Sequence, residues 1–260
     1  MRLEFLLPVR LAIGVASLAV LLALETWRPF FPGRTARARH AVRNLGVGLL
    51  NSLVVAALFG GLLQRVSDWS TANSFGLLHR LALPPWAAVA GAIVLFDAWM
   101  YGWHRANHVL PILWRFHRMH HTDPDLDVTS AVRFHPGEIL LSTGLRLGVL
   151  ALLGMSLPLL VLYEAVLTPV IQFHHSNVRI PEWLDRRLRA VVVTPHMHRI
   201  HHSELRAEHD GNYASIFSCW DRLFGSYKRR QHLREMALGL KDWQDGAWLT
   251  LPGMLKTPLR

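Results

Sequence analysis

The chain alternates long apolar stretches with shorter polar ones. The apolar stretches cover residues 3–25, 45–63, 83–103, 139–153 and 157–173. The longer ones approach the roughly 20 residues that an α-helix needs to cross the ~30 Å hydrocarbon core of a bilayer. The last two are short and are separated by "GMSLP", which contains Gly154 and Pro158. This break predicts a helical hairpin whose two ends emerge on the same face of the membrane.

The pattern predicts an all-α integral membrane protein with about four transmembrane helices or helical hairpins. Polar positions and most histidines concentrate in two pieces, 104–138 and 174–260, which flank the predicted hairpin. Because the hairpin returns the chain to the face it left, we expect both pieces in one compartment. There they would form a histidine-rich helical cap on the membrane helices.

Composition and charge support a membrane location. Of the 260 residues, 51% are hydrophobic and only 18% are charged, which is too apolar for an ordinary soluble domain. The formal net charge of +10 comes mostly from arginine, and the loop 28–43 carries five arginines whereas 64–82 carries two. Arginines between membrane spans mark cytoplasmic loops, so we expect a membrane surface rather than a nucleic acid as the partner. The histidine-rich face is then cytoplasmic, in a bacterium on the inner membrane.

Histidines recur at helical spacing in the two polar pieces. "HRMHH" and "HRIHH" both read HxxHH, and His104 and His108 are four apart. Residues three and four apart share one side of a helix, so their imidazoles can converge. The predicted metal ligands are His104, His108, His117, His120, His121, His135, His175, His198, His201 and His202. Since one metal takes about three to six ligands, this number implies two metals.

The remaining histidines and the single cysteine are expected to lie outside the set of metal ligands. Cys219 alone excludes an internal disulfide, a CxxC redox pair and a thiolate-rich metal site. In "QFHHSN" we expect His175 rather than His174 to be the ligand, and we expect His196 outside the ligand set. Ordinary surface or core roles are expected for His40, His79, His209 and His232. The acidic string "TDPDLD", which carries Asp123, Asp125 and Asp127, is expected to be a solvated helix end.

Four further residues are predicted to act at the site. They are Asp97, Tyr101, Glu138 and Glu164. Asp97 and Tyr101 share a helix face with His104, and Glu164 lies eleven residues before His175 on the hairpin's second helix. A carboxylate within a membrane span is costly unless it is paired, and carboxylates commonly orient ligand imidazoles. We therefore predict that Asp97 and Glu164 point toward the metals.

These motifs together resemble the fatty acid hydroxylase superfamily, also called the sterol desaturase family, of membrane non-haem di-iron enzymes. The resemblance includes the three histidine patterns, "FDxxxYxxHRxxH", "RFHPGE", "HHSN", "TPHMHRIHH" and "NYASIFSCWDRLFGSY", and covers about residues 93–228. The sequence departs from some relatives at Ile171, where they have a further histidine. For this reason we expect His135 to complete the ligand set.

The resemblance implies an enzyme that binds two iron ions, which zinc can replace in purified protein. Dioxygen is the co-substrate, and a C–H bond of a membrane lipid is hydroxylated or desaturated. The electrons must come from a separate donor protein, for which the basic segment "YKRRQHLR" is a candidate surface, as it is for lipid headgroups. We expect membrane helices with the arginine-rich loop in 1–82, the catalytic domain in 83–230 and a tail in 231–260.

Two other functional classes remain open. A membrane zinc-dependent hydrolase would also use histidines, but it generally needs a catalytic carboxylate beside its ligands, as in HExxH, and the three histidine clusters contain none. A metal transporter would place histidines along a path within the spans. Bound iron together with oxygen-dependent lipid oxidation separates the first interpretation from both.

Overall fold

A computed structural model describes residues 3–34 and 36–260, and the regular structure of these residues is helical. Five segments are long and apolar enough to cross a membrane. They are α1 (Leu3–Trp27), α2 (Arg37–Ala72, followed by the short α3, Leu77–Arg80), α4 (Pro85–Val109), α6 (Pro136–Leu153) and α7 (Leu157–His175). The predicted all-α class is confirmed, and every predicted apolar stretch lies in one of these segments, apart from the first two residues of 83–103, which precede α4.

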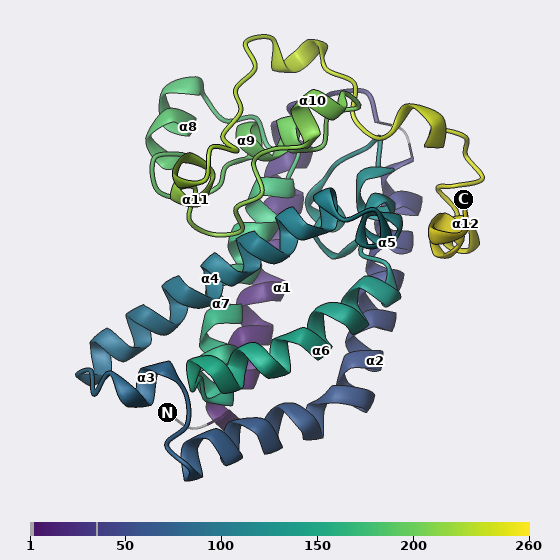
Figure 1. Cartoon of the computed structure of the whole chain (residues 1–260). Helices are drawn as coiled ribbons and strands as arrows, with labels where there is room; N and C mark the ends of the chain where they lie inside the picture. Colours follow the sequence, from purple (N-terminus) through teal and green to yellow (C-terminus); the bar gives the residue numbers. More distant parts are fainter. Residues whose placement is uncertain (1–2, 35) are drawn as a thin grey trace.

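The hairpin between α6 and α7 brings both polar pieces to one end of the membrane helices (Figure 1). Gly154 ends α6 with φ of 71°, in the left-handed region, and its N–H donates to the carbonyl of Ala151. A side chain there would also come within 2.8 Å of the Phe75 carbonyl oxygen. Both constraints favour glycine. α1 packs along α7 and α2 packs along α6, so the hairpin lies between the N-terminal helices.

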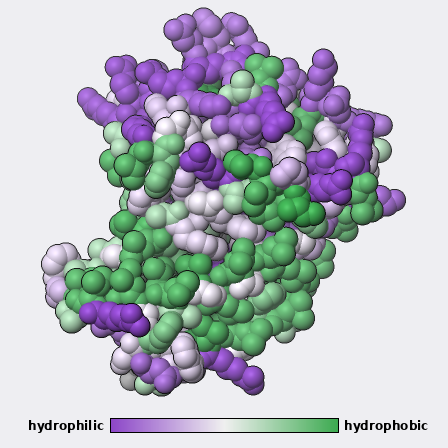
Figure 2. Space-filling view, in the orientation of Figure 1, coloured by the Kyte–Doolittle hydropathy of each residue, from purple (hydrophilic) through white to green (hydrophobic). Residues whose placement is uncertain are grey.

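The surface divides into an apolar part and a hydrophilic part. Figure 2 shows apolar side chains across the lower part of the molecule, which contains the long helices, and hydrophilic ones across the upper part. Leu11, Leu53 and Leu152 are each at least 60% exposed. Exposed apolar patches of this size mark a surface that meets a membrane rather than water. The chain is therefore a multi-pass membrane protein.

The upper part, here called the cap, comprises residues 110–135 and 176–260. Its helices are α5 (Pro111–His121), η1 (Val128–Val132), α8 (Glu182–Leu188), α9 (Pro195–His201), α10 (Arg206–His209), α11 (Cys219–Leu223), η2 (Leu233–Glu235), η3 (Lys241–Trp243), α12 (Leu251–Lys256) and η4 (Thr257–Leu259). The arginine-rich loop joins this cap, since Arg34 donates to the carbonyl of Leu126 over 2.6 Å and Arg43 to that of Leu249 over 2.9 Å. It thus lies on the same face as the histidine-rich pieces.

Two of the three aspartates after α5 are buried, so the expectation of a solvated helix end is wrong for them and fits only Asp125, whose side chain is 46% exposed. Asp123 and Asp127 are 0% and 2% exposed. His40 lies between them, with ring nitrogens 2.9 Å from Asp123 Oδ1 and 3.0 Å from Asp127 Oδ2. Ser130 Oγ donates to Asp123 over 2.6 Å. Buried carboxylates need such partners, and here they connect α2 to the cap and position the end of α5.

Candidate metal centre

Nine of the ten predicted ligands gather in two groups where the long helices enter the cap. In each group, one ring nitrogen from every histidine lies within 4.8 Å of the others. The first histidine group comprises His104, His108, His117, His121 and His201, and the second comprises His120, His175, His198 and His202. In each HxxHH motif the outer histidines, four apart, belong to one group and the middle one to the other. Residues four apart differ by only about 40° around a helix, which explains this division.

Backbone carbonyls fix the ring orientation in the first histidine group. His104 Nδ1 lies 2.8 Å from the Tyr213 carbonyl oxygen, and His201 Nδ1 lies 2.7 Å from that of Gly211. A carbonyl oxygen can only accept, so each Nδ1 must carry the proton and each Nε2 must present its lone pair. Both Nε2 atoms are buried and have no hydrogen-bond partner among the described residues. Their lone pairs are aimed at the centre of the group.

Carboxylates hold two other rings of the first group. Glu138 Oε1 lies 2.9 Å from His117 Nδ1, which brings this residue to the first histidine group, and its predicted catalytic role stays a prediction. Asp210 Oδ1 lies 3.4 Å from His108 Nδ1. Within residues 3–34 and 36–260, the Nε2 atoms of both histidines are also buried without a partner. A carboxylate in this position fixes the tautomer and makes the imidazole a stronger ligand.

The second histidine group brings lone pairs face to face. His175 Nδ1 lies 2.8 Å from the Ile171 carbonyl oxygen and His120 Nδ1 lies 3.2 Å from that of Arg133, so both rings carry their proton on Nδ1. Their Nε2 atoms are nevertheless only 3.1 Å apart. Two acceptors at this distance repel each other unless a cation lies between them. This arrangement therefore fits a bound metal ion.

Burial keeps the cap imidazoles neutral. Desolvation, followed by the neighbouring imidazoles, holds the pKa well below the usual value for His120, His121, His198 and His201. A neutral imidazole is the form that binds a metal. The donor set fits two metal ions, one in each group, and imidazole nitrogens suit iron as well as zinc. The ligand role of each histidine stays a prediction.

His135 lies outside both histidine groups, contrary to the expectation that it completes the set. Its Nδ1 accepts from the Gly137 N–H over 2.9 Å at the start of α6, and its Nε2 lies 3.1 Å from the Leu255 carbonyl oxygen. The ring thus satisfies a helix terminus. His174 also lies outside the groups, packed against the His198 ring with centroids 4.1 Å apart. His175 is the member of the pair that enters a group.

Asp97 and Tyr101 serve the fold instead of the histidines, which corrects their predicted roles. The Asp97 carboxylate is fully buried and accepts from Tyr163 Oη over 2.9 Å and from the Phe217 N–H over 3.0 Å. It thereby ties α4 to α7 and to the segment after Ser215. Tyr101 Oη lies 2.8 Å from Ser226 Oγ. These contacts anchor the loop whose Tyr213 carbonyl holds His104.

Glu164 does not reach the histidine groups, contrary to the prediction. It forms ion pairs with Arg10 of α1 and, over 2.8 Å, with Arg146 of α6. No role was predicted for these arginines or for Asp210. No sequence pattern around Asp210 indicated its role, because its partner His108 is 102 residues away. The arginines did carry one, since each interrupts an apolar stretch.

A cavity of about 200 Å³ connects the histidine groups to the membrane helices. Its histidine end is formed by His104, His117, His120, His174, His175 and His198. Its other walls come from α4, α6 and α7 and include Met100, Trp103, Ile139, Ser142, Arg146, Leu167 and Ile171. The cavity borders both groups and is mostly apolar away from the histidines, which makes it the candidate substrate site.

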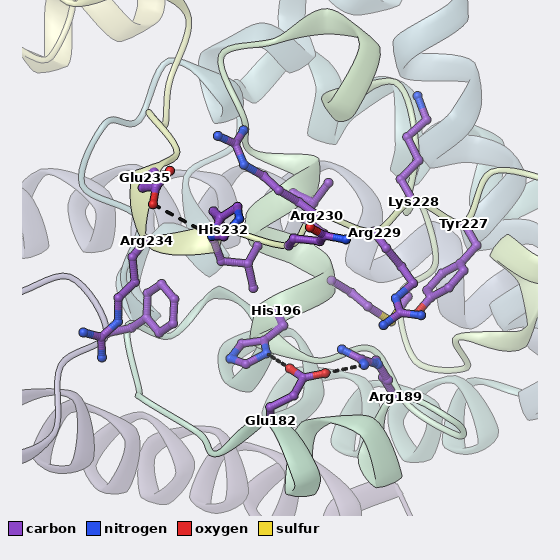
Figure 3. A pocket seen from close by; sticks show the side chains of 15 residues that line it. Glu182, Arg189, His196, Tyr227, Lys228, Arg229, Arg230, His232, Arg234 and Glu235 are labelled. Atoms are coloured by element: carbon purple, nitrogen blue, oxygen red, sulfur yellow. Dashed lines mark hydrogen bonds and ion pairs between the residues drawn. The ribbon is translucent and has the colours of Figure 1, made fainter.

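A third set of possible ligands, Glu182, Asp185 and His196, lies on the far side of α9. Figure 3 shows Glu182 between His196 and Arg189. Arg189 donates to Asp185 over 2.7 Å and to Glu182 over 2.6 Å. Because the guanidinium of Arg189 already pairs with both carboxylates, it occupies their oxygens and competes with a metal cation for them. The set is an ion-pair cluster, in agreement with the expectation for His196.

The same region forms a basic pocket of about 810 Å³. Its charged lining is drawn in Figure 3 and consists of Arg189, Lys228, Arg229, Arg230 and Arg234 together with Glu182 and Glu235. Five cationic side chains thus line the pocket with two carboxylates, and Arg189 and Arg230 also pair with Asp185 and Glu208 beyond the lining. Most of them come from the segment "YKRRQHLR". The pocket gives this segment a concave, positively charged surface.

Comparison with known proteins finds the family that the sequence motifs resemble. The fatty acid hydroxylase family matches residues 89–226. Ornithine lipid hydroxylase from Rhizobium tropici is 34% identical over 135 residues, which are 52% of this chain and 40% of that protein. Alkylglycerol monooxygenase from Homo sapiens is 27% identical over 199 residues, 74% of this chain and 41% of that protein. This chain therefore matches about two fifths of the length of each of these relatives.

A third relative is matched more evenly. Very-long-chain aldehyde decarbonylase from Oryza sativa subsp. indica is 27% identical over 177 residues, 65% of each protein. No solved structure matches the chain with significance. The family match spans more than half of the chain and contains every member of both histidine groups. The chain belongs to the fatty acid hydroxylase family.

Proposed function

We propose that the chain is a membrane-bound di-iron oxygenase that uses dioxygen to hydroxylate or desaturate a C–H bond of a lipid. The observation that carries this proposal is the pair of histidine groups bordering an apolar cavity between membrane helices. Family membership supports it, and the names of two relatives describe hydroxylation of an ornithine lipid and monooxygenation of an alkylglycerol.

The chain's own residues hold the ions and keep water out. Bound iron supplies dioxygen activation and C–H oxidation, chemistry that amino-acid side chains do not provide. His201 and His202 are both fully buried, and the Glu138 carboxylate orients His117. Such fixed and desolvated surroundings protect reactive chemistry from side reactions with water. Zinc can bind the same nitrogens in purified protein.

A membrane lipid suits the cavity better than a polar metabolite does. Apart from the histidines and Asn107, the walls contributed by α4 and α7 are apolar, and the cavity lies where those helices meet the cap. A lipid chain that enters between the helices never exposes its apolar surface to water. Such exposure would cost about 0.8 kcal/mol for each methylene. Hydroxylation and desaturation both begin with removal of hydrogen from such a chain, so the proposal includes both outcomes.

The proposed reaction needs two electrons from a separate donor protein. The basic pocket is a suitable docking surface because of its position as well as its charge. α9 presents Met197 and Ile200 to the pocket, whereas His198 and His201 of the same helix belong to the histidine groups. A helix with its side chains is about 10–12 Å across, so a docked acidic protein would lie about one helix diameter from the metals.

The face that carries the site is proposed to be cytoplasmic. The arginine-rich loop and both histidine-bearing pieces lie on one face, as the contacts of Arg34 and Arg43 support. An excess of arginine marks the cytoplasmic side. Cysteine labelling at position 206, where the Arg206 side chain is 83% exposed, from either side of the membrane and in a background without Cys219, tests the orientation.

Labelled dioxygen provides the decisive test of the function. Lipid extracts from cells with and without the protein should differ by a product with one added oxygen atom or two fewer hydrogens. A hydroxylated product must take its label from dioxygen. The competing zinc hydrolase gains one argument from the structure, since Glu138 Oε2 is buried without a partner among the described residues and lines the cavity beside His117. Hydrolysis without oxygen, with unchanged lipids, would establish that alternative.

A further inference from the structure

An ion triad with unequal charge lies among the membrane helices. Glu164 of α7 pairs with Arg10 of α1 and, over 2.8 Å, with Arg146 of α6. Two guanidinium groups thus share one carboxylate, which leaves a surplus of one positive charge. Ionisable groups within a membrane span are costly and persist where they are paired or have a function. Among the described residues, no second carboxylate pairs with either arginine to balance this charge.

Arg146 of this triad also lines the cavity that reaches the histidine groups. Glu138, Ser142 and Arg146 lie at positions i, i+4 and i+8 of α6, on the face that borders the cavity. The opposite wall is apolar and includes Leu167 and Ile171 of α7. Eight residues of helix rise roughly 12 Å, so one polar face leads from the carboxylate beside His117 to the guanidinium of Arg146.

The guanidinium of Arg146 has donors to spare. Its Nη1 donates to Glu164, whereas its Nε is buried and has no partner in the part of the chain that the structure describes. A buried charged donor without a partner is unfavourable, and a guanidinium can bind an oxyanion through two parallel hydrogen bonds. An oxyanion in the cavity would satisfy the donor and neutralise the triad together.

We propose that Arg146 binds the acidic group of the lipid substrate, a carboxylate or a phosphate, at the end of the cavity away from the histidine groups. This inference rests on the proposed function, because it names the substrate class of the same site. It has a consequence for regiochemistry. If the acidic group is fixed at Arg146, the oxidised carbon lies at a constant position counted from that group, whatever the total chain length.

Binding to the purified protein in a neutral detergent at pH 8 tests the proposal without turnover. The probes are myristate and its methyl ester, which differ in the negative charge and the ester methyl group. We expect myristate to bind at least about tenfold more tightly than the ester, the scale of a charge-assisted hydrogen-bonded pair. Dodecyl phosphate should compete with myristate. Equal affinity for myristate and its ester in the wild-type protein would overturn the proposal.

Two matched variants locate the anion. Arg146→Gln and Arg10→Gln each remove one positive charge and one partner of Glu164, but only Arg146 lines the cavity. The preference for myristate should fall to about twofold or less in Arg146→Gln and persist in Arg10→Gln and Arg146→Lys, where charge is retained at the cavity. A preference that survives in folded Arg146→Gln places the carboxylate elsewhere, for instance on a bound metal, and overturns the proposal.

The outcome is separable from that of the proposed function. Selective anion binding without any lipid oxidation would leave the binding site standing while the oxygenase fails. Lipid oxidation without charge-selective binding would support the oxygenase and overturn the anion site at Arg146. Acidic lipids of different chain length complete the test, since oxidation should keep its position counted from the acidic end. A position constant from the methyl end contradicts binding at Arg146.

Discussion

Both histidine groups use backbone carbonyls as partners, but among the described residues carboxylates contact rings of the first group only. In the first group carboxylates face the rings, with Glu138 at 2.9 Å from His117 and Asp210 at 3.4 Å from His108. In the second group the partners of His120 and His175 are neutral backbone carbonyls. The same amino acid is thus given two electrostatic environments.

The difference gives the two candidate metal positions unlike electrostatic surroundings. A negatively charged partner raises the basicity of an imidazole and stabilises positive charge at the metal, whereas a carbonyl mainly fixes the tautomer. The first group should therefore hold an ion of higher charge more readily than the second. In the second group the close approach of ring nitrogens makes the bound cation itself the main stabilising partner.

Removing one ligand from either group should have the largest effect. His201→Ala in the first group and His120→Ala in the second are each expected to abolish lipid oxidation and to lower bound metal by about one ion per chain, because each removes one convergent nitrogen. Elemental analysis after gentle extraction, alongside product analysis, measures both. An active His201→Ala protein with full metal content would contradict the site as described.

Two histidines outside the groups serve as controls for that experiment. His232, with a side chain 71% exposed, should be replaceable by alanine without loss of metal or activity. His135→Ala should keep both metals because His135 instead accepts from the N–H of Gly137 at the start of α6. Loss of one ion in the His135→Ala protein would restore the original ligand prediction.

Removing the charge from Glu138 should have the next largest effect. Glu138→Gln keeps an acceptor near His117 but loses the carboxylate, and we expect metal affinity or activity to fall roughly 10–100-fold. Asp210→Asn should cost less, since its contact is longer and its side chain is 33% exposed. Metal competition titrations compare the two variants. Equal losses would remove the basis for ranking these two partners.

Charge reversal in the basic pocket should slow only electron delivery. Arg229→Glu combined with Arg234→Glu is expected to lower turnover driven by an acidic ferredoxin about tenfold or more at low salt, because electrostatic attraction speeds association. Turnover with a small chemical reductant should be unchanged. An equal loss with both reductants would mean that the variant damages the histidine groups across α9.

Acidification should have the smallest effect, a loss of thermal stability in the metal-free protein. Burial lowers the pKa of His120, His198 and His202 below the ordinary value of about 6.5. In the metal-free protein the unfolded chain then binds protons that the folded chain refuses, so stability is full above that value and falls as the pH drops below it. Melting temperatures from pH 8 to pH 5 should decline by several degrees. An unchanged melting temperature would show that these imidazoles are not held neutral.

Sequence reasoning succeeded where the signal is local. Apolar stretches predicted the long helices because hydrophobic length acts within one segment, and "GMSLP" predicted the hairpin because Gly154 can adopt the left-handed conformation. Helical spacing correctly grouped the outer histidines of each HxxHH motif, because residues four apart share one side of a helix, but the middle histidine joined the other group. In contrast, "HPGE" gave no sign that His135 would accept a hydrogen bond from Gly137.

The sequence by itself determined the class of fold, the family and the nitrogen-rich character of the site. Only the tertiary structure decided how the histidines divide into two groups and which carboxylates serve them. Asp97 and Glu164 look alike along the chain, as single carboxylates in apolar stretches. Their partners, Phe217 for Asp97 and Arg10 for Glu164, lie 120 and 154 residues away. Contacts at such separations depend on packing between helices, which no local pattern of residues encodes.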